Sequence, residues 1–277
     1  MAGRFSLGWL KPPPISADGV MSLGDHLREL RYRVVFSLVF VVVAMIVSAI
    51  FYNQILAVML QPWYQAQELL RVSSPNLDPQ TVINGVSSPL TLALQIIAVT
   101  GLVLASPIWL YQLWAYIVPA LLAKEKKYAL VFIGTAVPLF CLGVAVGYFV
   151  LPQGISVMLA FTPTLGETTV VNLVDLQAFL ELMLRLMIVF GLGFLMPVVV
   201  VGANLVGVVK ASQLARARVY VIFGTFVFGA AATPSTDPVS MLALAVPMSL
   251  LYLGAEVVCR LNDRRKAKRA LAEAAAG

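Results

Sequence analysis

The chain has 277 residues, a net charge of +6, 60% hydrophobic residues and only 12% charged residues. Soluble domains carry about 25% charged and about 45–50% apolar residues, so a water-soluble core could not bury this much apolar surface. A bilayer can solvate these side chains, which indicates an integral membrane protein whose bundle of spans forms one domain. Anionic lipid and membrane topology explain the basic surplus, so we expect no nucleic-acid partner.

The N-terminal region contains a flexible segment and the start of a helix. Residues 1–21 include Pro12-Pro13-Pro14 and no long apolar run, which predicts a flexible cytoplasmic arm. Ser22 and Asp25 then fit a capping box. The apolar residues that follow recur at helical spacing, which predicts a short amphipathic helix that runs into the first span.

Six segments approach the about 20 apolar residues that a spanning helix needs. They are residues 34–52, 90–110 with a continuation at 111–118, 128–150, 183–208, 219–232 and 239–258. Pro107 predicts a kink in the second segment, and the fifth is short for a span, which indicates a thinner bilayer around it. We therefore predict an all-α integral membrane protein, with a six-span core at residues 22–261 and a basic, alanine-rich cytoplasmic tail at 262–277.

Lysine and arginine are concentrated on one side of this predicted topology. Seventeen of the 19 basic residues fall in the N-terminal segment, two loops and the tail, and only Arg71 and Arg185 lie opposite. The positive-inside rule assigns the basic side to the cytoplasm. Six spans return both termini to that side, whereas five would break the pattern. The long connections on the other side, residues 53–89 and 151–181, are predicted to form a periplasmic cap.

The chain offers little acid–base chemistry. Its one histidine, His26, precedes the first predicted span, so a Ser–His protease is excluded because the nucleophile needs a neighbouring histidine. The P-loop pattern GxxxxGK[ST] and the zinc-protease pattern HExxH are absent. Cys141 and Cys259 fall on separate predicted helices without metal-ligand spacing. We therefore predict that the chain is not an enzyme, and we expect no catalytic residue, cofactor or metal.

Two glutamates stand in basic surroundings on the predicted cytoplasmic side. Glu29 lies at the mouth of the first span, and Glu125 lies in the loop Lys124-Glu125-Lys126-Lys127. Glu29 and Arg33 are i,i+4 partners, and such a pair contributes about 0.2–0.5 kcal/mol. Glu125 could simply neutralise its lysines. From the residues alone this interpretation is favoured, because most surface charge pairs contribute little.

Five stretches, taken together and in order, resemble the TatC family, the membrane core component of twin-arginine protein translocation. The resemblance covers the chain from about Ser22 to Leu261. The stretches are residues 26–33 (HLRELRYR), 106–121 (SPIWLYQLWAYIVPAL), 124–127 (KEKK), 218–220 (RVY) and 233–248, which contains Thr233-Pro234, Asp237 and Ala245-Val246-Pro247-Met248. Any one of them alone would be a weak signal, but the set is specific.

The resemblance implies a receptor in the bacterial cytoplasmic membrane for signal peptides that carry consecutive arginines on folded precursor proteins. It also implies assembly with TatA and TatB, or with one dual TatA-type protein, self-association within the complex, and transport driven by the proton-motive force. The family's two signal-peptide glutamates match Glu29 and Glu125, and Arg31 matches a nearby position that we interpret as orienting the glutamate. Guanidinium binds carboxylate through two parallel N–H···O bonds, so two arginines need two acceptors on one face.

Several other matched positions have two interpretations each. Pro62 aligns with a family proline in the first periplasmic loop, and a simple turn would explain it equally well. Asp237 aligns with an acidic residue in the last periplasmic loop, where it could instead cap the sixth span. Tyr111 and Gln112 lie near the cytoplasmic end of the second span. An interfacial aromatic belt would explain Tyr111 and its neighbour Trp114 without any binding role.

One position departs from the family pattern. Many members carry glutamate or glutamine within the fourth span, facing a concave pocket, where this chain has Leu195. A mechanism that depends on an ionisable group at that place therefore cannot apply here. We predict that a partner helix packs against Leu195 through apolar contact.

Two alternative functions remain open at this point, a secondary transporter of a small solute and a purely structural membrane scaffold. Transporters usually show internal repeats and charged residues near mid-membrane. The two halves of this chain show no convincing repeat, and the span interiors are nearly free of charge. The family motifs therefore favour protein export over both alternatives.

Overall fold

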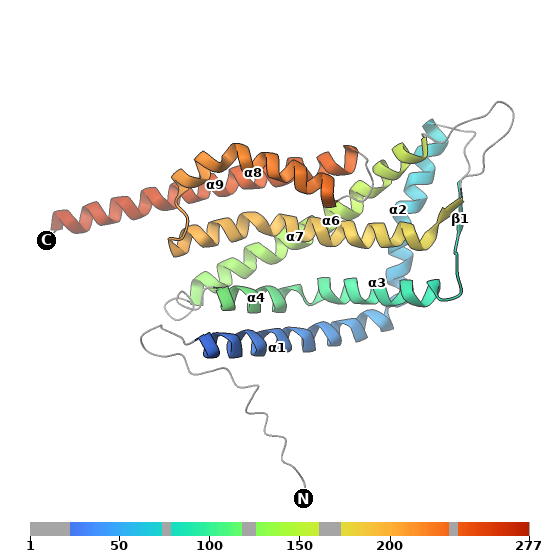
Figure 1. Ribbon diagram of the computed structural model, residues 1–277, viewed down its shortest axis with the longest axis horizontal. Coiled ribbons are helices and arrows are strands. Elements are labelled where there is room, and N and C mark those ends of the chain that lie inside the picture. Colours follow the sequence, from blue (N-terminus) through green and yellow to red (C-terminus); the bar gives the residue numbers. More distant parts are fainter. Residues whose placement is uncertain (1–22, 74–78, 118–125, 161–172, 233–237, 277) are drawn as a thin grey trace, which may run out of the picture.

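The computed structural model describes residues 23–73, 79–117, 126–160, 173–232 and 238–276, and its helices form one elongated bundle (Figure 1). The predicted arm at 1–21 lies outside the described residues. The elements are α1 (Leu23–Ile50), α2 (Tyr52–Ser73), β1 (Gln80–Val82), α3 (Ser88–Leu104), α4 (Ser106–Ile117), α6 (Lys126–Ala160), β2 (Leu173–Asp175), α7 (Leu176–Val206), α8 (Ala211–Ala232) and α9 (Pro238–Ala276).

The apolar helices account for the predicted spans. Five described helices, α1, α6, α7, α8 and α9, are long and apolar enough to cross a membrane, and α3 with α4 makes a sixth span if the bent pair counts as one. The two helices of this pair meet at an angle of 60°. The bend falls at Ala105, and Pro107 lies in the first turn of α4, where its missing N–H breaks no helical bond. The predicted kink is therefore confirmed.

The segments predicted as long connections contain a helix and two short strands. The helix α2 occupies much of the predicted connection at 53–89, although Pro62 lies inside it. The strands β1 and β2 form a parallel pair in which Gln80 lies opposite Leu173 and Val82 lies opposite Asp175. The architecture is thus a helical bundle with one short strand pair.

The two ends of the bundle are formed by different elements (Figure 1). At the end that we call the basic end, α1 and α8 begin and α4 and α7 finish. The strands and α2 lie at the other end, which we call the strand end. The helix α9 extends past the basic end without interruption to Ala276, so most of the predicted tail is helical.

The helix α7 forms the centre of the core. Its side chains Met183 and Phe190 are fully enclosed. On the neighbouring α6, Gly143 and Gly147 face α7 closely, and a Cβ added to Gly147 would lie 3.1 Å from the carbonyl oxygen of Leu186. Helices in membranes associate through such close packing between small residues, because lipid removes the hydrophobic driving force. This core fixes the helices whose ends carry the polar groups.

Candidate functional site

A buried carboxylate lies at the basic end, near the start of α1. Glu29 is only 6% exposed, and Arg33 donates from Nε and Nη2 to its Oε1 at 2.9 and 2.5 Å. The Nη1 of Arg33 also donates to Oε1 of Gln112 on α4 at 3.0 Å. Residues four apart on a helix are neighbours, so α1 forms the ion pair locally and Gln112 ties it to α4. The predicted pairing of Glu29 with Arg33 is confirmed.

The second oxygen of Glu29 is not used in this way. Its Oε2 is buried and accepts no hydrogen bond from any residue that the structure describes. A buried polar group without a partner costs about 1–3 kcal/mol, and more when it is charged. Hydrogen bonds to a carboxylate from a cationic donor are about twice as strong as neutral ones. This site can therefore accept one further donor, and a cationic donor suits it best.

Other residues of the matched motifs lie around the basic end or outside the described residues. The ring of His26 stacks on Tyr116 of α4, with centroids 4.5 Å apart, which adds a second contact between α1 and α4. Arg31 and Tyr111 are exposed. Glu125 lies outside the part of the chain that the structure describes. The roles predicted for Arg31, Glu125 and Tyr111 stay predictions.

The positions predicted as structural or partner contacts are spread over the bundle. Pro62 lies inside α2 and not in a turn, so the turn interpretation is wrong. Proline has no N–H, so the carbonyl of Val58 lacks its helical donor, and Tyr148 of α6 donates to that oxygen at 2.8 Å. Leu195 is half-buried against the main core, and Asp237 lies outside the described residues. Their partner contacts stay predictions.

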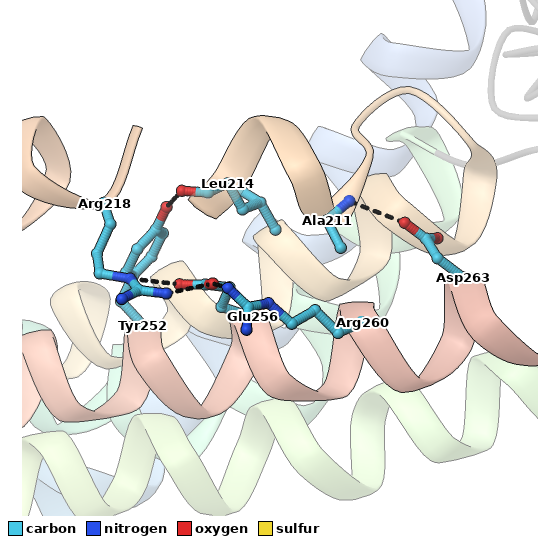
Figure 2. A network of polar contacts seen from close by, with 7 residues as sticks. All are labelled: Ala211, Leu214, Arg218, Tyr252, Glu256, Arg260 and Asp263. Carbon is cyan, nitrogen blue, oxygen red and sulfur yellow. Dashed lines mark hydrogen bonds and ion pairs between the residues drawn. The ribbon is translucent and has the colours of Figure 1, made fainter. Parts of the chain in front are cut away.

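A second buried carboxylate joins α8 to α9 at the basic end (Figure 2). Glu256 is 2% exposed, and Arg218 donates from Nε to its Oε2 at 2.9 Å and from Nη2 to its Oε1 at 2.7 Å. Arg260 approaches the same Oε1 at 2.5 Å, and Tyr252 donates to the carbonyl oxygen of Leu214 at 2.9 Å. Glu256 was not predicted from the sequence, although a carboxylate in an apolar run four residues before an arginine is a usable signal.

The helical tail takes part in the same end of the fold (Figure 2). Asp263 accepts hydrogen bonds from Nδ2 of Asn204 at 2.9 Å and from the backbone N–H of Ala211 at 2.8 Å. Lys266 donates from Nζ to the carbonyl oxygens of Asn204 and Leu205 at 3.3 and 3.2 Å. The carboxylate thus meets the start of α8 and the ammonium meets the end of α7, the signs that each helix end favours. Part of the basic tail therefore belongs to the folded bundle.

Asp175 organises the strand end by capping α7. Its Oδ1 accepts from the backbone N–H groups of Gln177 and Ala178 at 2.8 and 3.4 Å, which satisfies two unpaired donors of the first turn. Nδ2 of Asn84 donates to its Oδ2 at 3.1 Å. The bond from Asn84, followed by the bond from Gln177, lowers the pKa of Asp175. The ionised carboxylate therefore joins the connection after β1 to the start of α7.

These features define the class of the protein. Five or six membrane-crossing helices enclose an apolar core, and the described residues hold no group of three His, Cys, Asp or Glu side chains placed to bind a metal ion. Polar groups gather at the two ends of the bundle, and Glu29 keeps an unpaired acceptor there. This is a multi-spanning membrane protein whose most distinctive polar group is suited to binding a cation.

Comparison with known proteins identifies the family. The family model "Sec-independent protein translocase protein (TatC)" matches residues 25–247. The Sec-independent protein translocase protein TatC of Frankia casuarinae is 37% identical to this chain, over 91% of this chain and 69% of that protein. The protein of the same name in Xylanimonas cellulosilytica is 34% identical, over 92% of this chain and 89% of that protein. The crystal structure described as "Twin Arginine Translocase Receptor- TatC in DDM" superposes with a TM-score of 0.69 at 29% identity, covering 84% of this chain and 99% of that one.

The chain belongs to the TatC family of Sec-independent protein translocases, as its sequence motifs predicted. It is accordingly a multi-pass membrane protein of a bacterial translocation system.

Proposed function

We propose that the chain binds twin-arginine signal peptides of folded precursor proteins and is the scaffold on which the Sec-independent translocation site assembles. The observation that carries this proposal is the unpaired, buried Oε2 of Glu29 at the basic end of a TatC-family fold. The related crystal structure is described as a twin-arginine translocase receptor, which supports the same role. The chain itself acts without catalysis, and the proton-motive force drives transport.

The contacts around Glu29 suggest how one signal-peptide arginine is held. Of the two Glu29 oxygens, Arg33 donates only to Oε1, and its bond to Gln112 restrains the guanidinium. Oε2 of Glu29 is therefore left for an incoming donor. A guanidinium at Oε2 would form a charge-assisted bond in a site that is already partly desolvated. The second arginine needs a second acceptor, for which we propose Glu125, and we propose Arg31 as the residue that orients the site.

We further propose that the basic end faces the cytoplasm, with both termini there, and that the strand end forms a periplasmic cap. The distribution of charge supports this orientation, since Arg71 and Arg185 are the basic residues on the elements at the strand end. In this arrangement residues 1–21 are a cytoplasmic arm, residues 22–261 the six-span core and residues 262–277 a cytoplasmic tail whose first turns pack on the core.

The proposed partners are TatA and TatB, or one dual TatA-type protein, together with further copies of this chain and the lipid bilayer. Tyr111 and Gln112 lie on α4, which the bond from Arg33 to Gln112 joins to the Glu29 site on α1, so they are proposed contacts for a helix that arrives with the signal peptide. Leu195 would meet a partner helix through apolar packing, which its half-buried position on α7 allows. Pro62 and Asp237 are proposed to shape the periplasmic side.

The direct test is binding of a fluorescent twin-arginine signal peptide to the purified protein in detergent. Glu29→Gln removes the acceptor charge, and Glu68→Gln is the matched control, because Glu68 is 73% exposed on α2 at the strand end. A charge-assisted bond contributes about 1.5–3 kcal/mol, so Glu29→Gln should weaken binding by about tenfold to a hundredfold, while Glu68→Gln leaves it unchanged.

A second peptide, with its two arginines replaced by lysines, tests the same site in the unchanged protein. It should lose a similar factor, because an ammonium cannot reproduce the planar fork. Equal affinity for both peptides, or equal affinity of wild type and Glu29→Gln, would place recognition elsewhere in the chain. If the wild type bound neither peptide, the receptor proposal would fall and the small-solute transporter would become the leading function.

A further inference from the structure

Two guanidinium groups at the basic end share one buried carboxylate (Figure 2). Nη2 of Arg218 and Nη2 of Arg260 both approach Oε1 of Glu256, at 2.7 and 2.5 Å. Because they contact the same oxygen, the two nitrogens are close neighbours, separated by no more than the sum of the two contacts. The side chain of Glu256 is 3% exposed, so both cations cover it from outside.

The cluster does not balance its own charge. One carboxylate faces two arginines, which leaves an excess of one positive charge beside apolar helices. Nη1 of Arg218, and Nε and Nη1 of Arg260, are not engaged by any other described residue. Basic residues near a membrane surface attract anionic groups, so the cluster favours an anion that can use these remaining N–H groups.

The depth of the cluster matches a lipid headgroup layer. The helix α9 starts at Pro238, and the stretch from Pro238 to Arg260 rises about 33 Å at about 1.5 Å per residue. The hydrocarbon core of a bilayer is about 30 Å thick. When Pro238 lies at one membrane surface, Arg260 therefore reaches the headgroups of the opposite leaflet, at the basic end, and Arg218 lies beside it.

The surface around the two arginines is apolar and open. Arg218 and Arg260 remain 42% and 48% exposed although they bind a buried carboxylate. Their neighbours Val219, Val257 and Leu261 are 74%, 55% and 50% exposed. Val219 and Val257 lie on the membrane side of the two arginines, where exposed apolar side chains on a spanning helix face acyl chains. The arginine pair therefore lies where the headgroup of such a lipid would be.

We propose that Arg218 and Arg260 form a binding site for the phosphate of one anionic phospholipid in the leaflet at the basic end. Each guanidinium group presents parallel N–H donors that suit the oxygens of a phosphate, and the two groups lie beside the same carboxylate. An anionic headgroup supplies the missing negative charge, whereas the ammonium of a zwitterionic headgroup would cancel it. The site lies on α8 and α9, uses none of the residues around Glu29, and does not depend on the signal-peptide proposal.

The experiment measures lipid retained by the purified protein in native mass spectrometry during titration with dioleoyl phosphatidylglycerol or dioleoyl phosphatidylcholine. Arg260→Gln removes one cation and keeps the two bonds between Arg218 and Glu256, so the helix pair stays joined. Arg265→Gln is the matched control, because Arg265 is exposed on the same helix and no hydrogen bond or ion pair joins it to a described residue. Arg260→Lys keeps the charge without the guanidinium.

We expect the wild type to bind phosphatidylglycerol in preference to phosphatidylcholine, and Arg260→Gln to weaken that binding about fivefold, the contribution of one basic residue at a membrane surface. Arg265→Gln should bind like the wild type. Arg260→Lys should fall between the wild type and Arg260→Gln, because the ammonium keeps the charge but loses the guanidinium donors. Equal affinities for the two lipids, or equal losses in Arg260→Gln and Arg265→Gln, would overturn the proposal. Displacement of the lipid by inorganic phosphate at the same concentration would also overturn it, since the ligand would then be a free anion.

Discussion

The carbonyl group that Pro62 leaves without a donor gives the sharpest prediction about the strand end. In an unbroken helix, the N–H of residue 62 would donate to the carbonyl oxygen of Val58. Proline cannot donate, and the hydroxyl of Tyr148 on α6 fills that place at 2.8 Å. Tyr148→Phe removes only this hydroxyl, so it should leave the Val58 oxygen unpaired and loosen α2 from α6.

The size of the effect follows from where this bond lies. A typical hydrogen bond contributes about 0.5–1.5 kcal/mol net, and an unpaired buried acceptor costs about 1–3 kcal/mol. The bond to Val58 lies at the surface of the bundle, where interfacial water can replace part of it. We therefore expect Tyr148→Phe to cost about 1 kcal/mol, which lowers the melting temperature of a chain of about this size by about 2–4 °C.

A double-mutant cycle distinguishes this contact from any other role of Tyr148. Pro62→Ala restores an N–H that can donate to the Val58 oxygen, so the hydroxyl of Tyr148 becomes redundant in that background. Tyr148→Phe should then change the melting temperature of the Pro62→Ala protein by less than about 1 °C. Thermal unfolding of the four purified proteins measures the cycle, and Tyr220→Phe is the control because Tyr220 is 78% exposed and makes no hydrogen bond with a described residue.

Two results would refute this reasoning. The first is additivity, in which Tyr148→Phe lowers the melting temperature equally with proline or alanine at position 62. The second comes from hydrogen–deuterium exchange, which needs only the wild type and two single variants. Tyr148→Phe should speed exchange within α2 compared with Tyr220→Phe, and identical exchange would show that the hydroxyl does not restrain this helix.

Three further perturbations test other contacts. Gly202→Ala would place its Cβ 2.5 Å from ring carbons of Trp114, so it should cost about 1–3 kcal/mol in thermal unfolding. Glu256→Leu leaves Arg218 without its carboxylate, so it should lower the melting temperature by more than Tyr148→Phe does. The folded state lowers the pKa of Asp175, so its ionised form stabilises the protein fully above the pKa of the unfolded chain, and the effect is lost as pH falls from there through the lowered pKa. The melting temperature of Asp175→Asn should therefore lie below that of the wild type at neutral pH and converge with it in acid.

Much of the helical bundle could be predicted from the sequence because a spanning segment must be long and apolar whatever it packs against. The bend before Pro107 was predictable for a similarly local reason, since proline cannot continue the helix before it but is tolerated in the first turn of the next one. The pair of Glu29 and Arg33 also follows from spacing alone, because residues four apart face each other. Each of these features depends on neighbours in the sequence.

The features that could not be predicted depend on distant parts of the chain. The strand pair joins Gln80 to Leu173, two positions in segments with no strong strand pattern. The helix α2 was not predicted, because Pro62 argues against a helix. Tyr148 of α6 supplies the donor to the Val58 carbonyl oxygen that proline lacks, and this contact is visible only in the fold. Gln112 likewise becomes part of the Glu29 site only when α4 packs on α1.

The two buried carboxylates at the basic end differ in one respect that decides their roles. Arg218 binds both oxygens of Glu256, and Arg260 shares one of them. The unused hydrogen-bonding groups at this site are therefore N–H donors of the two arginines. Glu29 binds Arg33 through one oxygen only, so the unused group at that site is an acceptor, Oε2 of Glu29. An unused acceptor attracts a cationic ligand and unused donors attract an anionic one. This difference is the reason why we propose a site for an arginine peptide on α1 and a site for a lipid phosphate between α8 and α9, although both are built from the same two residue types.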